Sequence, residues 1–251
     1  MIRFFRQIRK NLMEQNKIRT YLFYAVGEIA LVMIGILLAL QVNNWNEDRI
    51  RKASEQDILK NLKSELIVNK EELQVIQKKH QRDTDAGMYF LSLFNTDVSN
   101  IPVSKLDSTL LFIESIWTFE PNDGYMKSLI GSGKIDLIQN VELKSLLASF
   151  DGKVIDATQE MDIIVALVGD RLWPAIDGKI SSSNRVQFFE DYLDFPVGSY
   201  TSDYSWFFKN RSMEDLISNI TSWKSGMVAE EEALIEIIDR MIYLIDNNLE
   251  N

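Results

Sequence analysis

The chain has 251 residues, a formal net charge of −10 at pH 7 and no cysteine. Its length suits one folded body with appendages, and the lack of cysteine excludes disulfides, cysteine-ligated zinc and thiol catalysis. The acidic body after Trp45 does not concentrate the lysine and arginine that neutralise phosphates, which argues against nucleic acid as a partner.

Residues 1–20 form a basic segment in which Glu14 is the single acid. Apolar residues within 1–13 fall at helical spacing, with the arginines largely elsewhere around the helix: Met1, Phe5, Ile8 and Leu12. We expect a cytoplasmic, interfacial amphipathic helix that contacts anionic lipid through Arg3, Arg6, Arg9 and Lys10. The alternative is a frayed basic tail that only enforces membrane orientation.

Residues 21–45 are predicted to form a single transmembrane helix. Their only formally charged residue is Glu28, and a hydrocarbon core needs about 20 predominantly apolar residues. The many Leu, Ile, Val and Phe side chains outweigh the roughly 2.5–3.5 kcal/mol that one central charge costs. Tyr21, Tyr24 and Trp45 bracket the span as interfacial aromatic residues, and the basic residues before it predict a cytoplasmic N-terminus.

A cleaved secretory signal peptide is the rival interpretation of this segment. The apolar run is longer than the roughly 7–15 residues of such a signal, and no Ala-x-Ala-like site follows, since the exit reads ALQVNN. We therefore expect an uncleaved signal anchor, with residues 46–251 forming a helical domain outside the cytoplasm.

One face of the predicted span is polar. Gly35, Ala39 and Asn46 each fall within about 20° of Glu28 around a helix. Small residues let helices approach closely in lipid, and an intramembrane carboxylate normally faces protein, so we expect an interface with a second copy or another membrane protein. The alternative is a proton or ion relay through Glu28 in an energy-coupled complex. A polar collar where the helix leaves the membrane would comprise Gln41, Asn43, Asn44 and Trp45.

The helix is expected to continue through Lys79, because residues 43–79 contain no glycine or proline. A stripe in three-four steps resembles a coiled coil with one polar position: Leu59, Leu62, Leu66, Asn69, Leu73 and Ile76. Asn69 can then fix the register or number of partner helices. The stripe can equally pack inside the chain's own bundle.

Two further long helices are predicted, together with shorter ones at about 84–94 and 104–117. One starts after Asn140 as N-cap and ends at Trp173-Pro174, and the other starts near Ser212. The first carries the stripe Leu143, Leu147, Phe150, Val154, Ala157, Met161, Ile164 and Val168. The second carries Leu216, Ile220, Trp223, Met227, Leu234, Ile238, Met241 and Ile245. Such stripes can bury one another, which predicts an all-α bundle.

Residues 177–211 interrupt the helices and contain many aromatic residues. They are expected to pack on the bundle, with a partner or ligand groove as the alternative.

No motif in the chain indicates a reaction. GSGK at residues 131–134 lacks the first glycine and the following Ser or Thr of a phosphate-binding loop, and a turn explains it better. His80 is the only histidine, which excludes a histidine-pair metal site, and we expect it to be solvated or at a helix end. A hydrolase would need a cleft with paired carboxylates, for which the sequence gives no spacing.

The stretches GEIALVMIGILLALQVNNWNE and YMKSLIGSGKIDLIQNVELKSLL resemble DUF 6090, an uncharacterised bacterial membrane protein family of Bacteroidetes type. The resemblance implies an inner-membrane protein with a periplasmic body and places Glu28, Gly35, Gln41, Asn43, Asn44, Trp45 and Asn46 in the shared signature. It implies no activity. The sequence thus predicts a self-associating scaffold or sensor-like interaction protein, with no catalytic site, metal or cofactor.

Overall fold

The computed structural model describes residues 18–189 and 194–249, which contain helices and connecting turns but no strand. The all-α prediction is therefore confirmed over those residues. The chain divides into two compact units, Met1–Asp57 and Ile58–Asn251. In chain order the helices are α2 (Ile18–Leu93), α3 (Val103–Glu114), α4 (Gly124–Gly131), the 3-10 helix η1 (Lys134–Leu137), α5 (Val141–Thr158), α6 (Glu160–Ala166), the π-helix η2 (Leu167–Leu172), α7 (Trp173–Ile176), α8 (Ser182–Val186), the 3-10 helix η4 (Phe207–Lys209) and α9 (Arg211–Asn248).

The first unit contains the N-terminal part of α2, whose apolar side chains are exposed. From Leu22 to Val42, its described Leu, Ile, Val, Met and Phe side chains each expose between 54% and 69% of their surface. Among the described helices, α2 is the one long and apolar enough to cross a membrane, by length and composition. Helix α2 continues to Leu93, which confirms that the predicted helix does not stop at Trp45. The prediction of a separate helix at about 84–94 is wrong, because residues 84–93 belong to α2.

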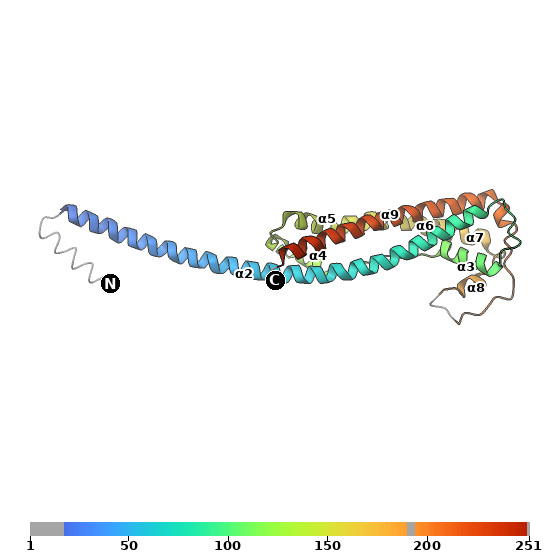
Figure 1. The fold of residues 1–251 in the computed structure, drawn as a ribbon, viewed down its shortest axis with the longest axis horizontal. Helices are drawn as coiled ribbons and strands as arrows, with labels where there is room; N and C mark the ends of the chain where they lie inside the picture. Colours follow the sequence, from blue (N-terminus) through green and yellow to red (C-terminus); the bar gives the residue numbers. More distant parts are fainter. Residues whose placement is uncertain (1–17, 190–193, 250–251) are drawn as a thin grey trace. The chain divides into compact units, whose positions relative to one another are not determined.

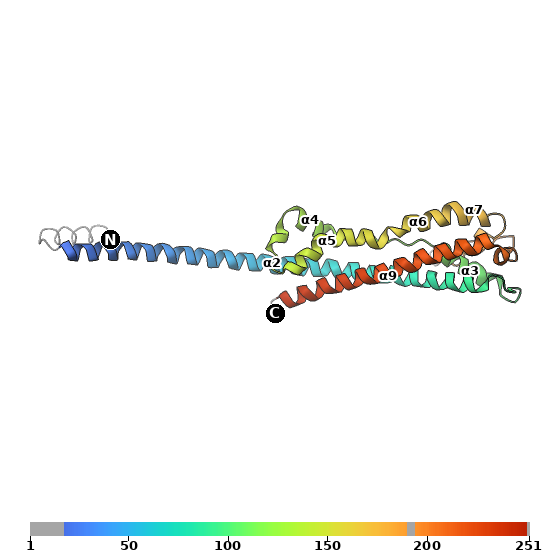
Figure 2. The ribbon, with the colours of Figure 1, turned by 90° about the horizontal axis from the view of Figure 1, so that it is seen from above.

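In the second unit, α9 lies antiparallel to the C-terminal part of α2. Lys63 pairs with Asp246 at 2.6 Å, whereas His80 contacts Glu231 at 2.8 Å, so residue numbers rise on α2 as they fall on α9. Helix α9 also packs along α5 and α6, and the views in Figures 1 and 2 show the three segments side by side. The predicted bundle of long amphipathic helices is thus present within this unit.

The leucine stripe of α2 is buried inside its own bundle. Leu59, Leu62, Leu66 and Leu73 have no exposed surface and pack with α5 and the C-terminal half of α9. Asn69, also fully buried, donates to the Asn122 carbonyl at 3.0 Å and accepts from the Asn122 N–H at 2.8 Å. The intramolecular alternative is therefore correct for this stripe, and its polar position binds the backbone of the connection before α4 rather than a partner helix.

The second predicted helix is divided by a π-helical segment. Asn140 caps α5 by accepting from the Leu143 N–H at 2.9 Å, as predicted. The prediction that Pro174 ends the helix is wrong, because α7 runs from Trp173 through Pro174 to Ile176. A proline ring clashes with the carbonyl four residues before it, and the wider π turn of residues 167–172 relieves such crowding.

The third predicted helix begins two residues earlier than expected. Asn210, rather than Ser212, is the N-cap of α9, since its side chain accepts from the Ser212 N–H at 2.9 Å. Within α9 the stripe is correct except at Trp223, which is 40% exposed, whereas its neighbour Lys224 is buried. The apolar side chain of Trp223 was expected to face the core, whereas the cationic side chain of Lys224 does so.

The aromatic residues of the 177–211 segment fill a second core. Phe207 and Phe208 are buried and meet Phe90 of α2 with ring centroids 5.8 and 5.1 Å apart. Edge-to-face pairs of this kind add to the stabilisation that comes from burial. The expectation that this segment packs on the bundle is confirmed for these residues. In GSGK, Gly133 adopts a positive φ of 72° at the start of η1, which is the predicted turn.

Candidate functional site

The residues predicted to form the membrane interface all lie on α2. Glu28 and Asn46 are half-buried, whereas Gly35 and Ala39 are exposed, and a Cβ added at Gly35 would meet no atom within 4 Å. Their role as an interaction face stays a prediction. The predicted collar residues Gln41, Asn43, Asn44 and Trp45 are also exposed. The predicted lipid contacts lie outside the described residues: Arg3, Arg6, Arg9 and Lys10.

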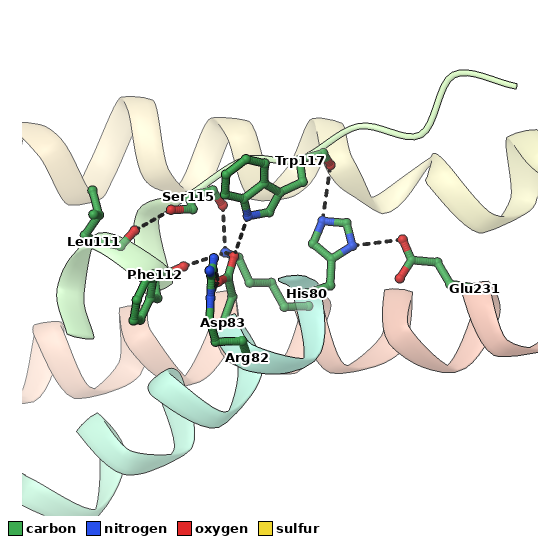
Figure 3. Close-up of polar contacts among 9 residues, drawn as sticks. His80, Arg82, Asp83, Leu111, Phe112, Ser115, Trp117 and Glu231 are labelled. Carbon is green, nitrogen blue, oxygen red and sulfur yellow. Dashed lines mark hydrogen bonds and ion pairs between the residues drawn. The ribbon is translucent and has the colours of Figure 1, made fainter. Parts of the chain in front are cut away.

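A buried polar cluster joins α2, α9 and the connection after α3 (Figure 3). Lys224 of α9 is 1% exposed, and its ammonium group donates to Asp83 Oδ2 at 3.3 Å and to the carbonyls of Phe112 and Ser115 at 3.2 and 2.7 Å. Burial lowers the pKa of Lys224, while the nearby Asp83 charge opposes that shift. Three acceptors match the three N–H donors, so the charged form is satisfied.

Asp83 is the acceptor that organises this cluster. It is 1% exposed, and its Oδ1 accepts from the Arg82 guanidinium at 2.9 and 3.2 Å. Its Oδ2 accepts from Trp117 Nε1 at 3.0 Å in addition to Lys224. Two cations and an indole therefore compensate one buried carboxylate, as burial of a charge requires.

His80 makes a second buried link between α2 and α9. Its Nε2 lies 3.2 Å from the Trp117 carbonyl, and its Nδ1 lies 2.8 Å from Glu231 Oε1. Because a carbonyl only accepts, His80 Nε2 donates to the Trp117 carbonyl. The expectation of a solvated or helix-end histidine is wrong, since His80 is 1% exposed in the middle of α2.

The cluster lies close to the boundary between the two hydrophobic cores. On α2, His80 and Asp83 lie between Leu73 of one core and Ala86 of the other. On α9, Glu231 lies between Met227 of one core and Leu234 of the other, whereas Lys224 lies within the core that contains Met227. Sequence reasoning missed Asp83, Lys224 and Glu231. A usable signal existed, because Lys224 and Glu231 stand at core-facing three-four steps of the α9 stripe, where charged residues need buried partners.

Next to the cluster, a cavity of about 990 Å³ opens between α3, the π-helix η2, α7 and α8. Helix α3 contacts α8, and α7 contacts η2, at the end of the bundle where Figure 1 labels α3, α7 and α8. Ligand pockets typically measure about 300–1,000 Å³. Most of its lining is apolar: Leu111, Ile116, Gly169, Trp173, Pro174, Ile176, Ile180, Val186, Phe189 and Phe195. The polar lining is Glu114, Ser115, Asp177, Ser182 and Arg185.

A buried ion pair forms part of the cavity wall. Arg185 Nε donates to Glu114 Oε1 at 2.7 Å, and Arg185 Nη2 donates to Glu114 Oε2 at 3.2 Å, which is a bidentate geometry. Trp173 Nε1 donates to the same Oε2 at 2.9 Å, and Arg185 Nη1 donates to the Ile180 carbonyl at 3.3 Å. Residues of the 177–211 segment thus line part of this cavity, and a role for the segment as a partner or ligand groove stays a prediction.

A carboxyl pair links α6 to α9. Burial and then the adjacent charge of Glu160 raise the pKa of Glu230. Neither residue lines the 990 Å³ cavity. In the described part of the chain, no group of three or more His, Asp or Glu side chains is arranged to hold a metal ion.

Comparison with known proteins gives a family and nothing further. No curated protein and no solved structure matches the chain. Residues 28–152 match DUF6090, a family of unknown function, and this region supplies His80, Asp83 and Trp117 to the cluster but not the residues of α9. The resemblance found in the sequence is confirmed, and the chain belongs to the DUF6090 family.

Proposed function

We propose that the protein is a single-pass, membrane-anchored sensor-like interaction module with a periplasmic helical domain. The observation that carries the proposal is the contrast along α2. Its described Leu, Ile, Val, Met and Phe side chains between Leu22 and Val42 are more than half exposed, whereas Leu59 and Leu62 are fully buried. Exposed apolar surface of this extent needs lipid or protein to cover it, and each Å² removed from water contributes about 25 cal/mol.

Self-association through the first unit is the second part of the proposal. Gly35 has open space around the position of a Cβ, so a second helix can approach its backbone closely. A shared face with Glu28 and Ala39 supplies a polar contact within the same interface. The partner is a second copy of this chain or another membrane protein.

The buried polar cluster gives the module a defined internal register. Displacing α2 along α9 by one turn would separate both the Asp83–Lys224 and the His80–Glu231 contacts, leaving charges buried without partners. Such a helix pair therefore has discrete arrangements rather than a continuum, which is the property that a signalling module requires. The proposal assigns no reaction to the chain.

Membrane topology tests the anchor. Because the chain lacks cysteine, a single Ser222→Cys or Asn16→Cys substitution gives a unique label site after the span or before it. Ser222 is exposed on α9. With a membrane-impermeant maleimide and a permeabilised outer membrane, we expect labelling at position 222 in intact cells and at position 16 only after lysis. Labelling at position 16 but not 222 in intact cells, or recovery of the chain from the soluble fraction, would overturn the proposal.

A further inference from the structure

We infer that the cavity lined by Glu114 and Arg185 is a binding site for a small, predominantly hydrophobic molecule that carries no negative charge. This inference deepens the proposed function by naming the ligand class of the sensor-like module. It rests on the shape of the cavity, the chemistry of its wall and the charges that the wall already holds.

The size and lining of the cavity determine the bulk of the ligand. Its volume of about 990 Å³ is at the upper end of ligand pockets and far above the roughly 30 Å³ of one water molecule. Ten of its fifteen lining residues are apolar, among them Trp173 and Phe189. A molecule with a large apolar body would remove this surface from water, at about 25 cal/mol per Å².

The ion pair determines the charge of the ligand. Among the described lining residues Arg185 is the one cation, and its guanidinium already donates to both oxygens of Glu114 and to the Ile180 carbonyl. An anion would have to compete with Glu114 for this guanidinium, and Asp177 adds a second carboxylate to the lining. A neutral or cationic molecule meets no such repulsion, and the Trp173 and Phe189 rings can accept a cation over their faces.

The cavity contacts the buried polar cluster through one residue. Ser115 lines the cavity, and its carbonyl accepts the shortest of the Lys224 hydrogen bonds, at 2.7 Å. A ligand that shifts the end of α3 therefore changes a contact made to the ammonium group in the centre of the bundle. Binding of a ligand in the cavity is thereby coupled to the Lys224 contacts that join α2 and α9.

Two fluorescent probes with the same aromatic skeleton test whether the cavity disfavours a negatively charged ligand. N-phenyl-1-naphthylamine is neutral, and 1-anilino-8-naphthalenesulfonate carries a sulfonate. We expect the full chain in detergent to bind the neutral probe at least tenfold more tightly than the anionic one, after subtraction of the signal from empty micelles. Equal or tighter binding of the anionic probe would overturn the inference.

Matched glycine substitutions locate the binding. Gly169 lines the cavity, whereas Gly152 lies on α5 outside it, and a Cβ meets no atom within 4 Å at either position. Gly169→Leu should abolish the saturable binding of the neutral probe, and Gly152→Leu should retain it. If Gly169→Leu does not fold by circular dichroism, Ser182→Leu fills the same cavity from α8. Unchanged binding in the folded cavity variant would place the probe elsewhere and refute the site.

Reversal of the charge preference gives an independent readout. Glu114→Gln removes the negative charge that faces the Arg185 guanidinium and keeps only one acceptor oxygen, so it should strengthen binding of the anionic probe by about tenfold relative to the neutral one. Asp177→Asn should shift the preference in the same direction by less, since Asp177 is exposed. No shift in the folded Glu114→Gln chain would contradict the proposed role of the ion pair.

The natural source of the ligand is found by mass spectrometry of organic extracts. Molecules that copurify with Gly152→Leu but not with Gly169→Leu occupy the cavity. Their presence in the bulk membrane extract identifies a lipid-derived ligand, and their absence from it identifies a molecule taken from the aqueous phase. Failure of probe binding leaves the cysteine-labelling result unaffected, so loss of this inference is distinguishable from loss of the proposed anchor.

Discussion

Lys224 and Asp83 lie 141 positions apart in the sequence and meet at 3.3 Å in the centre of the bundle, with each residue 1% exposed. Around them, the carbonyls of Phe112 and Ser115 complete the shell of the ammonium group. The contact fixes α9 against α2 at the point where two hydrophobic cores meet. A buried pair of this kind is costly to break, because removal of either partner leaves the other as an uncompensated buried charge.

Lys224→Met should destabilise the fold by about 3–5 kcal/mol, since it leaves Asp83 buried with one cation fewer. For a domain of this size that corresponds to a fall in Tm of roughly 6–20 °C. Thermal unfolding of the full chain in detergent checks it. The double variant with Asp83→Asn should lose less than the sum of the two single losses. Additive losses would show that the two side chains do not interact.

Gly87 of α2 approaches α9 too closely for any side chain. A Cβ at this position would lie 2.1 Å from Thr221 Oγ1, so Gly87→Ala should force the helices apart and cost about 1–3 kcal/mol. Gly226→Ala is the matched control, because nothing lies within 4 Å of its Cβ, and there the better helix propensity should stabilise by about 0.5–1 kcal/mol. Tm measured by circular dichroism separates the two.

Thr221→Ala should partly rescue Gly87→Ala, because it removes the Oγ1 atom that the new Cβ would meet. If Gly87→Ala is as stable as the parent chain, or if Thr221→Ala gives no rescue, the close approach of α2 and α9 at this point is wrong.

The carboxyl pair of α6 and α9 predicts a dependence of stability on pH. The pKa of Glu230 is raised from 4.5, chiefly by burial and then by Glu160, so the folded state binds more protons than the unfolded state between 4.5 and the raised value. The contribution of this group to stability is present below 4.5 and is lost as pH rises through the folded pKa. Glu230→Gln should therefore raise Tm at pH 7 relative to the parent chain but not at pH 4.

The exposed Glu236 on the same helix provides the control for this effect. Glu236→Gln should leave the difference in Tm between pH 4 and pH 7 close to that of the parent chain. A parallel pH profile for Glu230→Gln and the parent chain would show that Glu230 does not retain its proton in the fold.

The membrane interface is tested by association of the full chain. Gly35→Leu places a large side chain where close approach is proposed and should reduce detergent-resistant association and cross-linking several-fold. Ala30→Leu, an exposed position of the same helix outside the proposed face, should leave both unchanged. Unaltered association in Gly35→Leu and Glu28→Ala would remove the proposed face.

Glu28→Gln separates an interaction face from an ion relay. Glutamine keeps the shape and hydrogen bonding of the side chain but cannot ionise. A scaffold should therefore retain association in this variant. Selective loss of a function that depends on the proton gradient, with association intact, would favour the energy-coupled alternative.

Local sequence signals determined the elements of this protein. The apolar run with its basic flank indicated one helix able to span a membrane, and the absence of glycine and proline after it indicated that α2 continues. Asn140 was recognisable as a cap because an N-cap acts on N–H groups within three residues. Such interactions are short-ranged, so the residues that make them are neighbours in the chain.

Tertiary structure alone decided what the core positions do. Both Trp223 and Lys224 follow Ile220 at helical steps, and only the position of Asp83 on α2 selects the lysine for the core. By sequence, Asn69 fits the polar position of a coiled coil between chains. In the structure, the N–H and carbonyl of Asn122 supply both of its hydrogen-bond partners from within the chain. The cavity is likewise made by segments far apart in sequence. Burial and pairing of these polar groups depend on contacts between residues that lie 34 to 151 positions apart, and a local pattern does not identify such partners.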